Sequence, residues 1–308
     1  MSQPRPSRLL LDSPSLVYRA FFALPRSITA PDGQAVNAVR GYLDMLSRLL
    51  TDHRPGGMLN VLDADWRPQW RVDAWPGYKA TRAEDPPELP AQFPILRAVL
   101  EAAGLPVAEA AGYEADDVLG AVAIAAKDDE RLAVVTGDRD LLQLIRDPVV
   151  WVLFPVKGTS EMIRFDEAEV LARHGIPPGR YVDYAILRGD PSDGLPGLPG
   201  VGPKTAATLV GQFEDIDALV EGADTLKGKL AAGDRLPPRV AAALADNGPY
   251  LAAMRKVVPV ASDAAWTATA AHPPDRDALA ALAERHALDG PVERLEAAID
   301  AAGLALPS

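Results

Sequence analysis

Three short apolar runs in the first half of the chain each end in an aspartate. They cover residues 9–12, 59–63 and 132–138. Little alternation of apolar and polar residues within such runs is typical of parallel strands that are covered on both faces. Stretches with apolar residues at helical spacing lie between the runs, at 36–50 and 93–100. The sequence therefore predicts an α/β fold with a central, mostly parallel sheet.

The pattern changes near residue 180, where strand-like runs fade and helical patches separated by Gly and Pro follow. We expect a core at 1–180, a helical subdomain at 181–262 and a C-terminal helical segment at 263–308 that packs on the core. A chain of 308 residues has room for this organisation.

The composition excludes several classes of protein. Without cysteine, the chain cannot form disulfides, thiolate zinc sites or iron–sulfur clusters, and it has no cysteine nucleophile. No apolar run approaches the ~20 residues of a membrane span. The polar start at Met1–Arg8 leads into an apolar run that is too short for a signal peptide. We expect a cytoplasmic protein with no membrane partner.

The aspartates at the strand ends point to a shared acidic pocket, because the carboxyl ends of parallel strands meet at one edge of a sheet. Further acidic residues that could join Asp12, Asp63 and Asp138 are Glu114, Asp116, Asp117, Asp140, Asp190 and Asp193. At helical spacing, Glu114 and Asp117 share a face. A single aspartate at such a place is usually a helix cap or a turn former. Several in one chain favour a site for Mg²⁺ or Mn²⁺, which prefer oxygen ligands.

Two other segments suggest nucleic acid. Residues 66–82 hold three of the five Trp and four basic residues against one acid, which suits stacking on single-stranded DNA or, equally, a core-packing loop. Residues 197–206 form a Gly/Pro turn that leads into a helix and resembles a helix–hairpin–helix. Pro203 before Lys204 excludes a Walker A loop. The alternatives are an ordinary helix–helix turn and a turn whose backbone N–H groups hold a phosphate.

Five motifs in one order carry a family resemblance. They are Leu-Asp-Ser-Pro-Ser-Leu-Val-Tyr-Arg-Ala-Phe-Phe-Ala-Leu at 11–24, Gly-Tyr-Lys-Ala-Thr-Arg at 77–82, Gly-Tyr-Glu-Ala-Asp-Asp at 112–117, Thr-Gly-Asp-Arg-Asp-Leu-Leu-Gln-Leu at 136–144, and Gly-Asp-Pro-Ser-Asp-Gly-Leu-Pro-Gly at 189–197. Together they resemble the bacterial and phage 5′ nucleases, which comprise the 5′ nuclease domain of DNA polymerase I and free-standing flap endonucleases. The chain resembles the free-standing form, since no polymerase domain follows.

The resemblance implies a PIN-like 5′ nuclease core, a helical arch at about 66–102 and a helix–three-turn–helix DNA-binding subdomain. It implies 5′→3′ exonuclease and flap endonuclease activity on DNA with two or more divalent ions. The acids that match the family's metal ligands are Asp12, Asp63, Glu114, Asp116, Asp117, Asp138, Asp140, Asp190 and Asp193. Ser13, Leu62 and Gly194 depart from the usual residues beside these acids but remove no ligand.

The resemblance also assigns roles to basic and aromatic residues. Lys79 matches a lysine that approaches the scissile phosphate, Arg82 a neighbouring phosphate contact, and Tyr18 and Arg19 residues that line the same site. We expect DNA contacts from Arg71, Tyr78, Gly200, Gly202, Lys204 and Thr205. The turn at 197–206 is also where the family often holds a potassium ion. The implied partners are flaps, nicks and gaps in DNA, bound by a monomer in the nucleoid.

The net charge of −12 does not exclude DNA, because nine of the acidic residues are expected in one metal-binding pocket. Two other classes compete with this interpretation. A PIN-like ribonuclease would share the strand-end acids but lack the glycine hairpin and the Gly-Asp-x-x-Asp pair. A catalytically dead DNA-binding homologue would have lost acidic ligands.

Overall fold

A computed structural model describes residues 5–157, 161–225 and 238–304. At its centre is one sheet with the strand order β6-β5-β4-β1-β2-β3-β7. Its strands are β1 (Arg8–Asp12), β2 (Gly57–Val61), β3 (Val107–Glu109), β4 (Leu132–Val135), β5 (Val150–Lys157), β6 (Glu161–Phe165) and β7 (Thr267–Ala268). The five inner strands are parallel, and the edge strands β6 and β7 are antiparallel to their neighbours. The predicted α/β class and mostly parallel sheet are confirmed.

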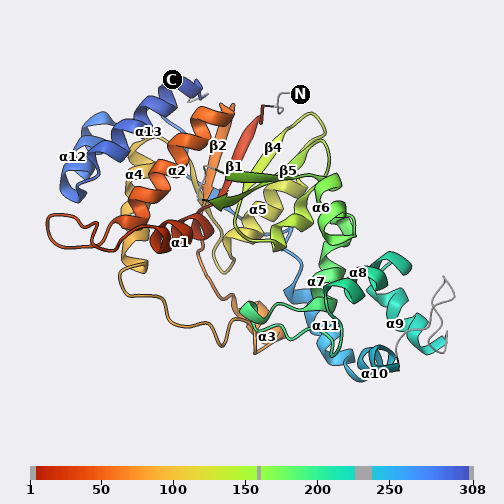
Figure 1. The fold of residues 1–308 in the computed structure, drawn as a ribbon. Helices are drawn as coiled ribbons and strands as arrows, with labels where there is room; N and C mark the ends of the chain where they lie inside the picture. The colour runs from red at the N-terminus through yellow and green to blue at the C-terminus, as the bar shows by residue number, and fades with distance from the viewer. Residues whose placement is uncertain (1–4, 158–160, 226–237, 305–308) are drawn as a thin grey trace.

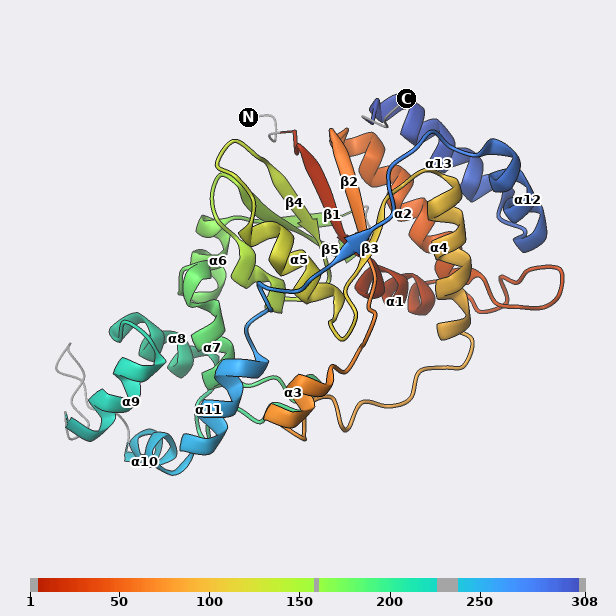
Figure 2. The same cartoon turned by 180° about the vertical axis from the view of Figure 1, so that it is seen from behind.

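Helices cover both faces of the sheet (Figures 1 and 2). Leu9 and Leu11 of β1 belong to one buried cluster, whereas Leu10 belongs to the other. The first cluster is shared with α1 (Ser13–Ala23), α2 (Asn37–His53), α4 (Phe93–Ala102), α12 (Arg276–His286) and α13 (Asp289–Ala302). The second is shared with α5 (Ala115–Ile124) and α6 (Glu167–His174). Burial on both faces explains why the inner strands are uniformly apolar.

The remaining helices extend the molecule away from the sheet, at the lower right of Figure 1. They are α7 (Tyr181–Arg188), α8 (Pro203–Gln212), α9 (Ile216–Thr225), α10 (Pro238–Asp246) and α11 (Gly248–Val257). Leu187, Leu209 and Met254 from these helices continue the second buried cluster. Part of the expected subdomain at 181–262 lies outside the described residues, at 226–237.

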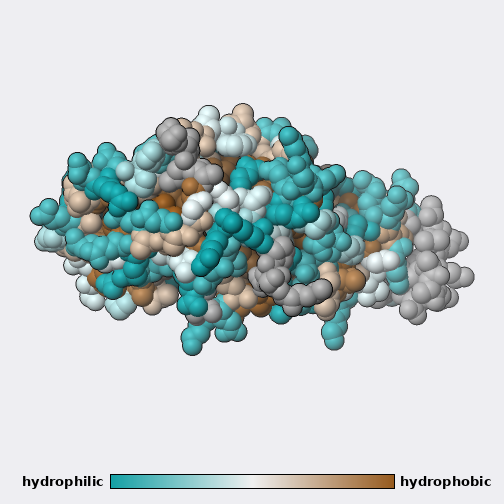
Figure 3. Space-filling view, turned by 90° about the horizontal axis from the view of Figure 1, so that it is seen from above, coloured by the Kyte–Doolittle hydropathy of each residue, from teal (hydrophilic) through white to brown (hydrophobic). Residues whose placement is uncertain are grey.

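The outline is elongated and mostly hydrophilic when it is viewed from the side where both termini lie (Figure 3). Among the described residues, no helix has the length and apolar character needed to cross a membrane.

Only parts of the expected helical arch at 66–102 are helical in the structure. Helix is present only at α3 (Gln69–Ala74), in a short 3₁₀ turn (Pro90–Gln92) and in α4. The chain between Trp75 and Leu89 is irregular, because Pro76, Pro86 and Pro87 cannot donate helical backbone hydrogen bonds. Helix α4 is part of the core, where it packs against α12. In Figure 2 the irregular segment crosses below the sheet from α3 to α4.

Candidate active site

Three aspartates stand at the carboxyl ends of neighbouring parallel strands. Asp12 is the last residue of β1 and caps α1, where its Oδ1 accepts a hydrogen bond from the Ser15 N–H at 3.3 Å. Asp63 follows β2 and accepts a hydrogen bond from the Ala115 N–H at 2.7 Å, at the start of α5. Asp138 follows β4, and its Oδ1 accepts from the Asp140 N–H at 2.8 Å. The sheet thus brings together three acids that are far apart in the sequence.

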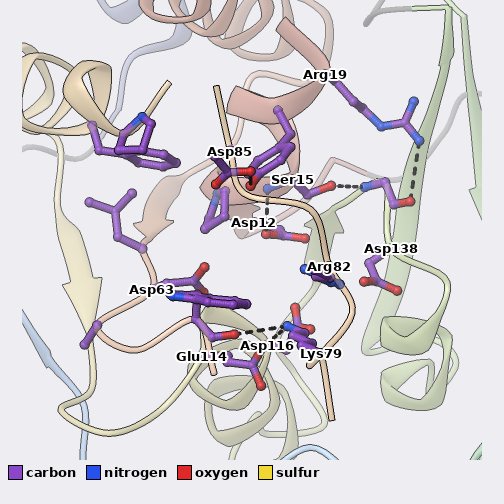
Figure 4. Close-up of a pocket in the computed structure, with 18 of the residues that line it drawn as sticks. Asp12, Ser15, Arg19, Asp63, Lys79, Arg82, Asp85, Glu114, Asp116 and Asp138 are labelled. Atoms are coloured by element: carbon purple, nitrogen blue, oxygen red, sulfur yellow. Dashed lines mark hydrogen bonds and ion pairs between the residues drawn. The ribbon is translucent and has the colours of Figure 1, made fainter. Parts of the chain in front are cut away.

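These acids line a cavity of about 1020 Å³ below α1. The acidic side chains on its wall are Asp12, Asp63, Glu84, Asp85, Glu114, Asp116 and Asp138, and the basic ones are Arg19, Lys79, Arg82 and Arg97. Segment 82–85 and the start of α4 form the opposite wall. Figure 4 shows Asp12, Asp63 and Asp138 around a common space, with Lys79 and Arg82 between them. Carboxylates and cations therefore line one open cavity.

Crowding of like charges is visible in the pKa values. Burial, with Asp138 and Asp63 close by, raises the pKa of Asp12 to about 7, although a 2.5 Å hydrogen bond from the Thr136 hydroxyl opposes this shift. Desolvation by the surrounding protein raises the pKa of Asp63 to about 6, although its side chain is exposed toward the cavity. Burial and neighbouring acids raise the pKa of Asp116 well above its usual range. Anything that brings positive charge here would relieve this repulsion.

A second acidic group adjoins the cavity. Burial, followed by Asp138, Asp193 and Asp190, raises the pKa of Asp140 well above its usual range. Asp190 accepts hydrogen bonds from the Ser192 N–H at 2.9 Å and the Ser192 hydroxyl at 2.5 Å. Asp193 is paired with Arg82 at 2.5 Å. Asp138 lies between the two acidic groups and interacts with both.

Lys79 is held at the junction of the two groups. Its Nζ donates to Glu114 and, at 3.3 Å, to the Trp66 carbonyl, while its backbone N–H donates to the Asp193 carbonyl at 2.9 Å. Burial alone would lower the pKa of Lys79, but Glu114 and Asp193 outweigh it and the pKa is raised. The side chain is therefore a buried ammonium group beside the acids. Its backbone is left-handed, with φ at 51°.

Arg71 differs from its expected role. It was expected to contact DNA, but only 3% of it is exposed. Its guanidinium group donates to Glu114 at 2.5 Å, to both oxygens of Asp117 at 2.7 and 2.8 Å, and to the Val257 carbonyl at 3.1 Å. These bonds engage all three nitrogens of the buried guanidinium group, so the group is not available to bind a phosphate. Arg71 joins α3, the start of α5 and the end of α11.

Asp117 also differs from its expected role as a metal ligand. Besides Arg71, its carboxylate accepts from the Glu114 N–H at 3.1 Å and the Ala261 N–H at 2.8 Å. The side chain is fully buried and does not line the cavity. Its oxygens are already saturated with hydrogen bonds. Tyr78, expected at the DNA, is likewise buried, with its hydroxyl donating to Glu114 at 2.7 Å.

The other predicted residues are more accessible. Tyr18 lines the cavity and its hydroxyl donates to Asp85, and Arg19 lies over the Phe154 ring at 5.3 Å. The turn before α8 contains Gly200, with φ at 82°, and Gly202, which caps the helix without a side-chain hydrogen bond. Lys204 is exposed, and Thr205 is half-buried at the same helix end. The first N–H groups of α8 thus lie at the surface.

Sequence reasoning missed two residues that shape the site. Thr136 donates from its hydroxyl to Asp12 and accepts from the Asp138 N–H at 2.8 Å, so it sets the spacing of two acids. Its place directly before Gly-Asp was a usable indication. Asp85 pairs with Tyr18 from the irregular segment, and no pattern in the sequence indicates this contact.

The chemistry of the site suits hard divalent ions, because every acidic ligand is an oxygen donor and several of these acids repel one another. As the side chains stand, no three acidic or histidine residues in the described ranges converge on one ion position. Lys79 forms an ion pair with Glu114, and Arg82 forms one with Asp193, so these carboxylate oxygens are already engaged. The ligand set therefore fits divalent ions in the chemistry of its donor atoms.

Comparison with known families decides the classification. A model described as "5'-3' exonuclease, N-terminal resolvase-like domain" matches residues 7–175, and one described as "5'-3' exonuclease, C-terminal SAM fold" matches residues 176–277. The chain belongs to the 5′-3′ exonuclease family. The resemblance inferred from the five motifs is confirmed.

Relatives within the 5′-3′ exonuclease family cover nearly the whole chain. The 5'-3' exonuclease of Streptomyces coelicolor is 46% identical over 303 residues, which are 93% of this chain and 98% of that protein. The 5'-3' exonuclease of Mycobacterium tuberculosis is 43% identical over 318 residues, with 95% and 97% covered. DNA polymerase I of M. tuberculosis is 43% identical over 239 residues, which are 77% of this chain but 26% of the polymerase.

Solved structures share the fold. The T5 D15 protein co-crystallized with metal ions has a TM-score of 0.64 at 16% identity, with 96% of this chain and 99% of that chain covered. Flap endonuclease-1 from Methanococcus jannaschii has a TM-score of 0.63 at 18% identity, with 96% and 93% covered. The topology is therefore that of the flap endonucleases.

Proposed function

We propose that this chain is a structure-specific 5′ nuclease that removes nucleotides from 5′ ends and cuts 5′ flaps in DNA. The observation that carries the proposal is the cavity in which strand-end acids meet Lys79 and Arg82. Phosphodiester hydrolysis needs positive charge at the phosphate and an activated water. Family membership supports the reaction class, and a role in flap removal during replication and repair follows from it.

Two divalent ions, Mg²⁺ or Mn²⁺, would supply the activated water and stabilise the leaving 3′ oxygen. The first would be held by Asp12, Asp63, Glu114, Asp116 and Asp138, and the second by Asp138, Asp140, Asp190 and Asp193. We leave Asp117 out of the ligand set, because its carboxylate is fully engaged by Arg71 and backbone N–H groups.

The chain's own cations orient the substrate. Lys79 lies beside the acids with its ammonium group already desolvated, so that a phosphate drawn into the cavity meets it without a large solvation cost. Arg82, more exposed, offers a planar group that can bind phosphate oxygens once it leaves Asp193. Tyr18 and Arg19 line the same cavity from α1.

The duplex would bind to the helical part of the chain. At the start of α8 the cap residue Gly202 has no capping side chain. The backbone N–H groups of Gly202, Lys204 and Thr205 are available there, Pro203 has none, and Lys204 adds a positive charge. We propose a core at 1–180, a duplex-binding subdomain at 181–262 and a C-terminal segment at 263–308. The proposal also includes a potassium ion bound at the turn 197–202. The protein would be a monomer and would be located in the cytoplasm with the nucleoid.

The test is cleavage of a duplex with a 5′-labelled flap by the purified protein. We expect products near the flap junction with Mn²⁺ or Mg²⁺ and none in EDTA. An all-RNA hairpin is the matched substrate for a PIN-like ribonuclease. Faster cleavage of the RNA, or binding of the flap without cleavage, would overturn the proposal.

A further inference from the structure

Trp66 is a large aromatic residue that stays open to water on the wall of the candidate active site. It lies three residues after Asp63, lines the cavity and is 54% exposed. An indole ring gains most of its stability from burial, so an exposed one beside a charged cavity lacks a packing role. The position calls for a ligand with a flat apolar surface.

The other aromatic residues of this segment are not available for such a ligand. The Tyr78 ring is buried and its hydroxyl is bonded to Glu114. Trp75 donates to the Gly194 carbonyl at 3.0 Å and packs edge-on against Tyr250. Trp70 is half-buried and packs against Arg71 and Tyr113. Of the four rings at 66–78, Trp66 alone is exposed, and it lines the cavity.

The backbone of Trp66 is bonded directly to one of the cationic residues of the cavity. Its backbone carbonyl accepts a hydrogen bond from the Lys79 ammonium group at 3.3 Å. Arg82 lines the same cavity. A nucleotide combines a flat base with a phosphate, and here a flat ring and two cations line the same cavity. Base–aromatic stacking contributes about 1–3 kcal/mol per base and tolerates every base.

We propose that Trp66 stacks on one base of the single-stranded 5′ segment, beside the phosphate that Lys79 and Arg82 bind. This inference rests on the proposed function, because it takes DNA as the occupant of the cavity. Trp66 would then be a positioning residue that fixes the register of the strand. One particular base, counted from the flap junction, would be stacked.

The test measures binding of a 5′-flap duplex in EDTA, where cleavage is off. Single abasic sites are placed in turn along the flap. We expect Trp66→Ala to weaken binding of the intact flap about fivefold or more, and Trp66→Phe to retain most of the affinity. At one abasic position the wild type should lose the same factor, and Trp66→Ala should lose nothing further.

The matched control is Trp266→Ala, which removes a second exposed tryptophan, 38% exposed, in the connector before α12. It should bind every flap as the wild type does. Trp66→Ala keeps the backbone carbonyl that holds Lys79, so a loss of binding reports the ring itself. An unchanged melting temperature verifies that the variant is folded.

Two outcomes would overturn the inference: equal affinity of Trp66→Ala and wild type, or a loss that is the same at every abasic position. Cleavage of the flap by the wild type with Mn²⁺ is measured in parallel. If cleavage occurs while Trp66→Ala binds normally, only the stacking fails. If the abasic pattern appears without any cleavage, the stacking stands and the proposed function fails.

Discussion

At the scale of single residues, Asp138 is the acid on which the two acidic groups depend. Asp193 and Asp190 contribute to its raised pKa, and it contributes to those of Asp12 and Asp140. Its Oδ1 also accepts the Asp140 N–H, a bond that an asparagine oxygen can keep. A substitution of Asp138 by asparagine can therefore remove the negative charge while keeping the shape of the side chain and this hydrogen bond.

We expect Asp138→Asn to abolish cleavage of a 5′ flap, because both proposed ion sites lose a negative ligand. Binding of the flap in EDTA should stay equal or become slightly tighter, since a charge that repels phosphate is removed. The measurements are single-turnover cleavage and a binding titration. Activity within about tenfold of the wild type would contradict the two-site assignment.

Asp12 leads to a prediction about pH. Its pKa is raised from 3.8 to about 7 in the folded chain, so the fold favours the protonated carboxyl. This contribution to stability is fully present below pH 3.8 and is lost as the pH rises toward 7. In EDTA, the melting temperature should therefore fall between about pH 4 and pH 7. Asp12→Asn should flatten this slope and melt higher than the wild type at the upper end.

At the scale of elements, the start of α5 shows what the motif spacing could and could not predict. Glu114 and Asp117 share a helix face, as their i, i+3 spacing predicts, and both bond to Arg71. Their spacing carries no information on what covers that face. Asp117 was therefore assigned to the metal and Arg71 to the DNA. The residue between them, Asp116, is the one that lines the cavity beside Glu114.

Breaking the buried contact between α3, α5 and α11 should be costly. Arg71→Ala leaves Asp117 without a counterion inside the protein, whereas Glu114 keeps Lys79. Breaking a buried pair in this way typically costs about 3–5 kcal/mol of unfolding free energy. Urea unfolding of the wild type and the variant measures this loss of unfolding free energy. The matched control is Arg276→Ala, whose ion pairs with Glu296 and Asp300 are exposed and contribute at most about 1 kcal/mol. Similar losses in both variants would show that the Arg71 cluster contributes little.

The start of α8 gives a prediction about duplex binding. If its N–H groups and Lys204 bind a phosphate, Lys204→Ala should weaken binding to all sequences alike and reduce the salt slope by about one. Lys127→Ala is the matched control, since this exposed lysine lies between α5 and β4, on the side of the sheet where the parallel strands begin. An unchanged slope in Lys204→Ala would make the turn at 197–206 an ordinary helix connection.

At the scale of the whole molecule, the fold was predictable where short, uniformly apolar strands lie at the centre of the sheet. β1, β2 and β4 were found from such runs. β3 and β7 have three and two residues, too few for a periodic pattern. β6 is an edge strand with mixed burial, and β5 ends in two exposed residues after a proline. Their pairing depends on neighbours distant in sequence.

The segment below the sheet leads to a prediction about how DNA enters. Residues 82–85 and the start of α4 close one side of the cavity, and α1 closes the other. A single strand that reaches the acids must pass between them. A bulky group on the 5′ end should therefore slow cleavage when it is attached before the protein binds, and have little effect when it is attached afterwards. Equal rates on blocked and free flaps would mean that the strand enters from the side.

The hydrogen bonds of Arg71 have a consequence for the order of events. This one guanidinium group is bonded to a carbonyl at the end of α11 and to carboxylates at the start of α5. A small rotation of α11 under a bound duplex would pull on Glu114, which belongs to the cavity wall. The guanidinium group therefore connects the end of α11 to the start of α5. If α11 shifts when a duplex binds, we expect Glu114 to shift with it, so that occupancy of the helical part and the position of this acid change together.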